Sequence, residues 1–182
     1  MNTIDSILEY NKNFVESGEY QSYRAEKYPG KKLAILSCMD TRLTLLLPAA
    51  LGLKNGDVKI IKNAGALVSH PYGSVMRSLL VCVYELGVET ILVIGHYDCG
   101  MQNLSSEKIT AKMIEAGISE EAIQKVKSEI DYDKWLSGFG NVEQSVKDTV
   151  EQIKNHPLIP PKINVVGLVM DPETGRLNKI EH

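Results

Sequence analysis

The sequence predicts a single α/β domain, residues 1–182, with a mostly parallel central β-sheet flanked by helices. Short apolar runs alternate with amphipathic segments along the chain, which is the order that repeated strand–helix–strand units produce. Hydrophobic residues make up 43% of the 182 residues and charged residues 24%, a balance typical of a globular domain with one substantial core. The sequence contains no internal repeat or low-complexity linker that would divide it.

Four short apolar runs predict the strands of this sheet, at residues 32–37, 58–66, 90–95 and 163–171. The first, KLAILS, predicts a buried strand. The second, VKIIKNAGA, predicts a strand that leads into a glycine turn. The third, TILVIG, is rich in Ile and Val on both faces, as is typical of parallel strands covered on both sides. The fourth, INVVGLVMD, is expected to be the last strand, because the residues DPETG that follow it are typical of a turn.

Four other segments predict helices, at residues 2–26, 73–87, 106–130 and 141–155. The second of these closes at Gly87, a favourable residue for a helix C-terminus. The third predicts two polar helices with a break near Gly117. The fourth is amphipathic and ends before Pro157. We expect residues 1–30 to form an N-terminal helical arm and residues 102–140 to form a helical insertion.

Charge and hydropathy exclude two classes of partner. The net charge of −3 and the pI near 5.8 provide no basic face for nucleic acid. The most apolar run, residues 43–53, is too short to cross a bilayer and is interrupted by Pro48, so we expect no membrane association. The N-terminus lacks the basic end and apolar stretch of a signal peptide, which indicates a cytoplasmic protein. We attach no function to His182.

Three cysteines, an odd number, indicate metal binding or catalysis rather than a disulfide in a reducing compartment. Cys38 follows the first predicted strand, whereas His96 and Cys99 follow the third. Because the carboxyl ends of parallel strands meet at one edge of a sheet, these three side chains are expected to converge. Two thiolates and an imidazole suit Zn²⁺, and three protein ligands leave the fourth tetrahedral position open, as in catalytic zinc sites.

Each of these motifs alone is weak evidence, and two other residues compete with them. A cysteine after a strand is often a packing residue, and His-x-x-Cys occurs by chance; it is the coincidence of both motifs at two strand ends that favours a metal site. Cys82 lies in the apolar helix 73–87, where packing is the better interpretation. His70, in the sequence VSHPYG, is a conceivable ligand, but its loop position favours a role in a turn or at a pocket rim.

Asp40 and Arg42 follow Cys38 by two and four residues. They could be a surface ion pair, which would contribute little to stability. Their proximity to a zinc ligand instead places them on the open side of the metal. There, Asp40 would accept a hydrogen bond from a zinc-bound hydroxide and orient it, and Arg42 would keep that carboxylate ionised and fixed in direction.

The motifs Cys38-x-Asp40-x-Arg42 and His96-x-x-Cys99, with KNAGALV (62–68) between them, resemble the β-class carbonic anhydrases, in particular their short, archaeal-like branch. The resemblance implies a zinc lyase that reversibly hydrates carbon dioxide to bicarbonate and a proton. It also implies one Zn²⁺ per chain and a homodimer or higher homo-oligomer with active sites near the dimer interface. In some members of this family the aspartate that corresponds to Asp40 becomes a fourth zinc ligand in a closed state.

Two other functions remain open. The same zinc site could hydrolyse carbon disulfide or carbonyl sulfide, since relatives of this family do so with a similar ligand set. The protein could instead be a non-catalytic zinc- or bicarbonate-binding protein, although a structural zinc would require a fourth cysteine or histidine. The presence of both Asp40 and Arg42 favours catalysis.

Overall fold

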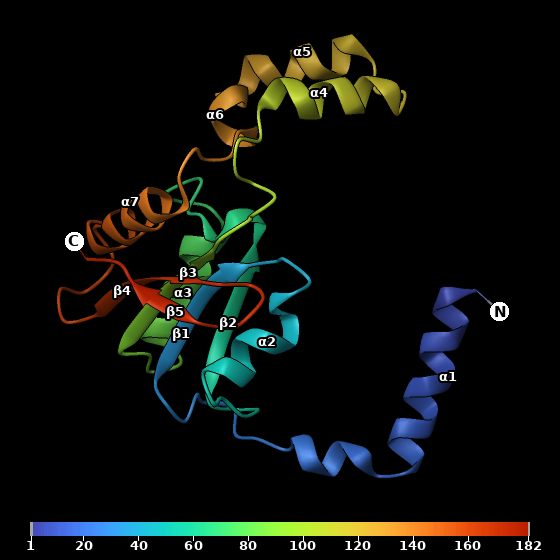
Figure 1. The fold of residues 1–182 in the computed structure, drawn as a ribbon, viewed down its shortest axis with the longest axis vertical. Helices are drawn as coiled ribbons and strands as arrows, with labels where there is room; N and C mark the ends of the chain where they lie inside the picture. The colour runs from blue at the N-terminus through green and yellow to red at the C-terminus, as the bar shows by residue number, and fades with distance from the viewer. Residues whose placement is uncertain (1, 182) are drawn as a thin grey trace.

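A five-stranded sheet forms the centre of the computed structural model, which describes residues 2–181 (Figure 1). The strands are β1 (Leu33–Cys38), β2 (Val58–Asn63), β3 (Thr90–His96), β4 (Asn164–Met170) and β5 (Leu177–Lys179). Their order across the sheet is β2-β1-β3-β4-β5; the first four are parallel, and β5 pairs antiparallel with β4. The predicted α/β class and the mostly parallel sheet are therefore confirmed.

Helices cover both faces of the sheet. They are α2 (Leu43–Ala50), α3 (Ser74–Tyr84) and α7 (Val142–Lys154). Successive side chains of a strand point to opposite faces. In β1, Leu36 accordingly joins the core formed with α3 and α7, whereas Ile35 joins the core formed with α2. Cys82 of α3 is buried in the first of these cores, in agreement with the predicted packing role.

The prediction for 58–66, a strand that leads into a glycine turn, is confirmed: β2 ends at Asn63 and the turn begins at Ala64. The 3-10 turn η2 (Ala64–Ala66) follows, with φ of 83° at Gly65 and 58° at Ala66. Backbone in this left-handed region cannot continue a strand. The side chain of Asn63 closes the turn, since it both donates to and accepts from the backbone of Leu67.

The N-terminal segment consists of α1 (Thr3–Glu16) and the 3-10 helix η1 (Glu19–Tyr23), which stand away from the sheet (Figure 1). The predicted continuous helix over 2–26 is wrong, because Gly18, at φ 75°, interrupts it. All residues of α1 are described by the structure, and none of them is buried. We call α1 and η1 the arm.

A second projection leaves the body after β3 and contains α4 (Ser106–Glu115), α5 (Glu120–Glu129) and the unpredicted α6 (Tyr132–Leu136). The break between α4 and α5 falls at the predicted Gly117, whose φ is 91°. Residues 101–104 and 138–140 run side by side at its base and exchange backbone hydrogen bonds. We call this paired segment the neck. Within residues 2–181, no helix is long and apolar enough to span a membrane. His182 lies outside the described residues.

Candidate metal centre

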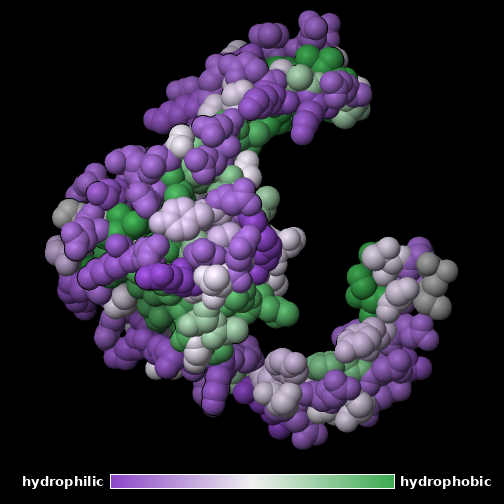
Figure 2. All heavy atoms as spheres, viewed as in Figure 1, coloured by the Kyte–Doolittle hydropathy of each residue, from purple (hydrophilic) through white to green (hydrophobic). Residues whose placement is uncertain are grey.

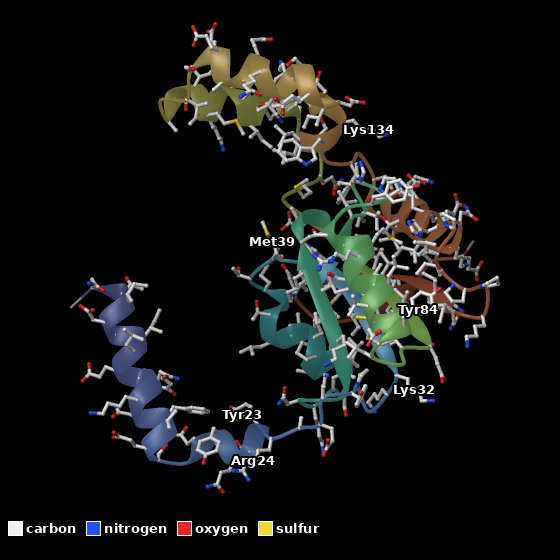
Figure 3. All side chains as sticks on the ribbon, turned by 180° about the vertical axis from the view of Figure 1, so that it is seen from behind. Tyr23, Arg24, Lys32, Met39, Tyr84 and Lys134 are labelled. Atoms are coloured by element: carbon white, nitrogen blue, oxygen red, sulfur yellow. The ribbon has the colours of Figure 1, made fainter. Side chains whose placement is uncertain are left out.

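The sheet brings Cys38, His96 and Cys99 together at the carboxyl ends of β1 and β3. These strands are parallel neighbours with Ser37 opposite Ile94, so the last residues of both strands reach the same edge of the sheet. Cys38 ends β1 and His96 ends β3, and Cys99 lies in the turn that follows β3. Met39, labelled in Figure 3, marks this edge. The convergence predicted from the two strand ends is therefore present in the structure.

The distances within this cluster suit a tetrahedral metal ion. The ligand atoms of the three residues lie within 4.8 Å of one another, and all three side chains are buried. The sulfur atoms of Cys38 and Cys99 are 3.8 Å apart. Two thiolates at the usual Zn–S distance of about 2.3 Å, held at a tetrahedral angle, are also separated by about 3.8 Å. The donor set fits Zn²⁺ without rearrangement of these sulfurs.

His96 offers an unused nitrogen to the same point. Its Nδ1 lies 2.8 Å from the carbonyl oxygen of Tyr97, which can only accept, so Nδ1 carries the proton. In the neutral imidazole Nε2 then bears a lone pair; this nitrogen is buried and has no hydrogen-bond partner among the described residues. A buried, unpartnered acceptor is costly unless something binds to it. A hydrogen bond from the other ring nitrogen to a carbonyl is the usual way in which metal-bound histidines are oriented.

The electrostatics of the cluster also favour a cation. The pKa of the Cys38 thiol is lowered to about 4, first by the hydrogen bond from Cys99 and then by His96 and backbone N–H groups, which together outweigh burial. The pKa of Cys99 is raised, because its thiol donates to that thiolate and is buried. The two thiols alone thus carry one negative charge, and a coordinated dication would displace the second thiol proton as well.

Asp40 and Arg42 lie beside this cluster and are joined by three hydrogen bonds. Oδ1 of Asp40 accepts from the backbone N–H of Arg42 (2.9 Å) and from its Nε (3.0 Å), and Oδ2 accepts from Nη2 (2.9 Å). The side-chain hydrogen bonds from Arg42 lower the pKa of Asp40 to about 2, so the carboxylate is ionised at neutral pH. Its Oδ2 lies 3.7 Å from Nε2 of His96 and therefore faces the centre.

Comparison with known proteins identifies the family. The family model described as "Carbonic anhydrase" matches residues 33–177, most of the chain. The chain belongs to the carbonic anhydrase family. It is 56% identical to YtiB of Bacillus subtilis, a protein named provisionally as a carbonic anhydrase, over 99% of this chain and 97% of that one. The crystal structure of β-carbonic anhydrase isoform I from Trichomonas vaginalis covers 99% of this chain and 98% of its own, with a TM-score of 0.91 and 36% identity. This carbonic anhydrase is therefore of the predicted β class.

A relative of different activity is more distant. The carbon disulfide hydrolase of Acidianus sp. (strain A1-3) is 30% identical over 175 residues, which cover 88% of this chain and 83% of that protein. The relatives of this chain thus include a protein whose named substrate is carbon disulfide.

Sequence reasoning was right about His70 and missed Asp98. His70 lies apart from the metal cluster: it is exposed, and its Nδ1 accepts a hydrogen bond from the backbone of Tyr72, which agrees with the predicted turn role. Asp98 was missed, although its carboxylate accepts a hydrogen bond from Arg42 at 2.8 Å. The only sequence signal for Asp98 was its position between His96 and Cys99.

Proposed function

We propose that this protein is a zinc-dependent carbonic anhydrase that reversibly hydrates carbon dioxide to bicarbonate and a proton. The observation that carries the proposal is the convergence of Cys38, His96 and Cys99, with the ionised Asp40 facing them, in a chain that belongs to this family. Bound there, Zn²⁺ would supply the Lewis acidity that makes water a nucleophile near neutral pH.

In this proposal the side chains divide the work between them. Cys38, His96 and Cys99 hold the metal, and the carbonyl of Tyr97 fixes the His96 tautomer. Asp40 accepts a hydrogen bond from the attacking nucleophile through Oδ2, the oxygen that faces the centre, and so aims its lone pair at the carbon of carbon dioxide. Arg42 keeps Asp40 ionised and oriented, which also restrains the carboxylate from becoming a fourth ligand. The proton that is released passes to buffer.

The direct test is a stopped-flow assay of carbon dioxide hydration with chelator-treated protein before and after reloading with Zn²⁺. We expect hydration only after reloading, with one Zn²⁺ per chain. Stoichiometric zinc without hydration would contradict the proposal and favour a non-catalytic binding protein. Release of hydrogen sulfide from carbon disulfide, with no hydration of carbon dioxide, would instead assign the chain to the alternative hydrolase activity, the activity named for the Acidianus relative.

We also propose that the chain assembles as a homodimer or a higher oligomer through the arm. Ile4, Ile7 and Leu8 of α1 are each more than half exposed. Hydrophobic side chains lie on the side of the arm that faces the hollow beside the body (Figure 2). An apolar helix face that its own domain leaves uncovered requires a partner surface. Sedimentation equilibrium should give at least twice the 20.2 kDa chain mass, and Ile7→Glu should shift the protein toward the monomer. A wild-type monomer at micromolar concentration would contradict the proposal.

Finally, we propose a cytoplasmic location. All three cysteines lie within the described residues and are free thiols, and the proposed site needs two of them reduced. Cell fractionation of the native host should recover the protein with cytosolic markers, and recovery with membrane or secreted fractions would contradict this location.

A further inference from the structure

The guanidinium of Arg42 is held from two sides. On one side, Nε and Nη2 donate to the two carboxylate oxygens of Asp40. On the other side, Nη1 donates to Oδ2 of Asp98 at 2.8 Å, and Nη2 also donates to the backbone carbonyl of Asp98 at 2.8 Å. Asp40 and Arg42 follow β1, whereas Asp98 follows β3. Arg42 therefore bridges the two loops that also carry the candidate metal ligands.

The backbone of Asp98 is arranged for this double contact. Its φ is 53°, in the left-handed region, which is uncommon for residues other than glycine but is tolerated by aspartate. In this conformation both the carbonyl and the carboxylate of Asp98 accept from the same guanidinium. A carboxylate that served only to be hydrated would point into water. The Asp98 carboxylate instead accepts a second hydrogen bond from the guanidinium that already donates to the Asp98 carbonyl.

Stability is a poor explanation for the contact. The side chain of Asp98 is 84% exposed and that of Arg42 is 38% exposed. Ion pairs between groups this exposed contribute little to folding, because water screens them. Orientation is the better explanation, since a long side chain with several rotatable bonds is fixed only when it is held at more than one point. If Asp40 were its only partner, the Arg42 guanidinium would be free to move together with the Asp40 carboxylate.

We propose that Asp98 is a positioning residue for the hydration reaction: it fixes Arg42 and, through Arg42, the orientation of the Asp40 carboxylate beside the metal centre. The inference rests on the proposed function for its kinetic consequence. Asp98 touches Arg42 and not the ligand atoms, so its loss should leave zinc binding intact. The effect should fall on kcat, because the direction of the Asp40 carboxylate matters most when the nucleophile attacks.

The kinetic test compares zinc-loaded Asp98→Ala and Asp98→Asn with wild type. We expect Asp98→Ala to lower kcat about two- to fivefold with KM and zinc content unchanged, because one exposed charged contact is lost while the carbonyl contact remains. Asp98→Asn should recover part of the loss, since the amide oxygen can still accept from Nη1. Glu89→Ala is the matched control. This variant removes the exposed ion pair between Glu89 and Lys32, whose charged atoms are 2.6 Å apart. Glu89 precedes β3, whereas Asp98 follows it, so the control should leave kcat unchanged.

A second measurement reads Arg42 directly and does not depend on activity. In ¹⁵N NMR spectra of the zinc-loaded wild type, the Nη groups of Arg42 should give separate signals, because hydrogen bonds on both sides slow rotation of the guanidinium. In Asp98→Ala these signals should broaden or merge, whereas in Glu89→Ala they should not. Unchanged Arg42 signals together with an unchanged kcat in Asp98→Ala would overturn the inference. A wild type that does not hydrate carbon dioxide would refute the proposed function, and the Arg42 signals would then still decide whether Asp98 positions the guanidinium.

Discussion

Replacement of Asp40 by asparagine separates metal binding from catalysis. In the structure Asp40 accepts three hydrogen bonds, all from Arg42: two at Oδ1 and one at Oδ2. An asparagine that keeps its oxygen at the Oδ1 position retains the first two. Its amide nitrogen then replaces Oδ2, so that a donor faces the Nη2 donor of Arg42. The opposite amide orientation is worse, because it turns the NH₂ group toward two donors of Arg42 instead of one.

The size of the effect follows from what Oδ2 faces. This atom lies 3.7 Å from Nε2 of His96, so in Asp40→Asn the amide NH₂ group points into the centre and carries no negative charge. The nucleophile then loses the acceptor that orients it. Removal of one positioned hydrogen-bonding group from a catalytic site typically raises the barrier by about 2.7–4 kcal/mol, which corresponds to a loss in kcat of about 100- to 1,000-fold. Zinc content should remain that of wild type, because none of the three ligands is altered.

The assay is stopped-flow hydration of carbon dioxide by zinc-loaded protein from pH 6 to 9, with the zinc content of each sample measured. The control is Asp171→Asn, in the turn after the neighbouring strand β4. Its carboxylate also accepts backbone N–H groups, from Glu173 and Thr174, but through a single oxygen that an asparagine can replace. This control should keep wild-type rates. An Asp40→Asn enzyme as fast as wild type at every pH would show that Asp40 plays no part in the chemistry, and the proposed division of roles would be wrong.

Two further predictions concern metal affinity and the neck. Cys38→Ser should weaken Zn²⁺ binding by more than about 100-fold, since losing a ligand costs more than losing the partner of a ligand; Cys82→Ser should retain stoichiometric zinc by elemental analysis, and equal loss from both would refute the ligand assignment. Gly138→Ala should lower the free energy of unfolding by about 1–3 kcal/mol in urea titrations, because its Cβ would overlap the backbone carbonyl oxygen of Met101. Gly140→Ala, whose Cβ meets no described atom within 4 Å, should change it by less than about 1 kcal/mol, and equal stabilities of the two variants would contradict the close approach in the neck.

The features predictable from the sequence were those with strong local signals and a simple geometric consequence. Apolar runs of five or six residues identified β1 and β3. The rule that carboxyl ends of parallel strands share an edge then brought Cys38 to His96 and Cys99, which the structure bears out as a spatial cluster. The roles of these residues as ligands, and of Asp40 and Arg42 in catalysis, remain predictions.

The features that sequence reasoning missed depend on tertiary contacts. The strand β5 has only three residues and exists through its pairing with β4, and α6 has only five. The helix α2 was hidden by Pro48, which lies inside it and usually indicates a break. Asp98 was missed because its contact with Arg42 joins positions 56 residues apart in the chain, which no local pattern reveals.

X-ray absorption at the zinc K edge of the purified, zinc-loaded protein tests the central claim most directly, since it reports which atoms surround the metal. The account predicts two sulfur ligands at about 2.3 Å, one imidazole nitrogen at about 2.0–2.1 Å and one further light atom, and the loss of one sulfur in Cys38→Ser. A spectrum with no sulfur ligand, or one that is unchanged in Cys38→Ser, would contradict the assignment of Cys38, His96 and Cys99 as the metal centre.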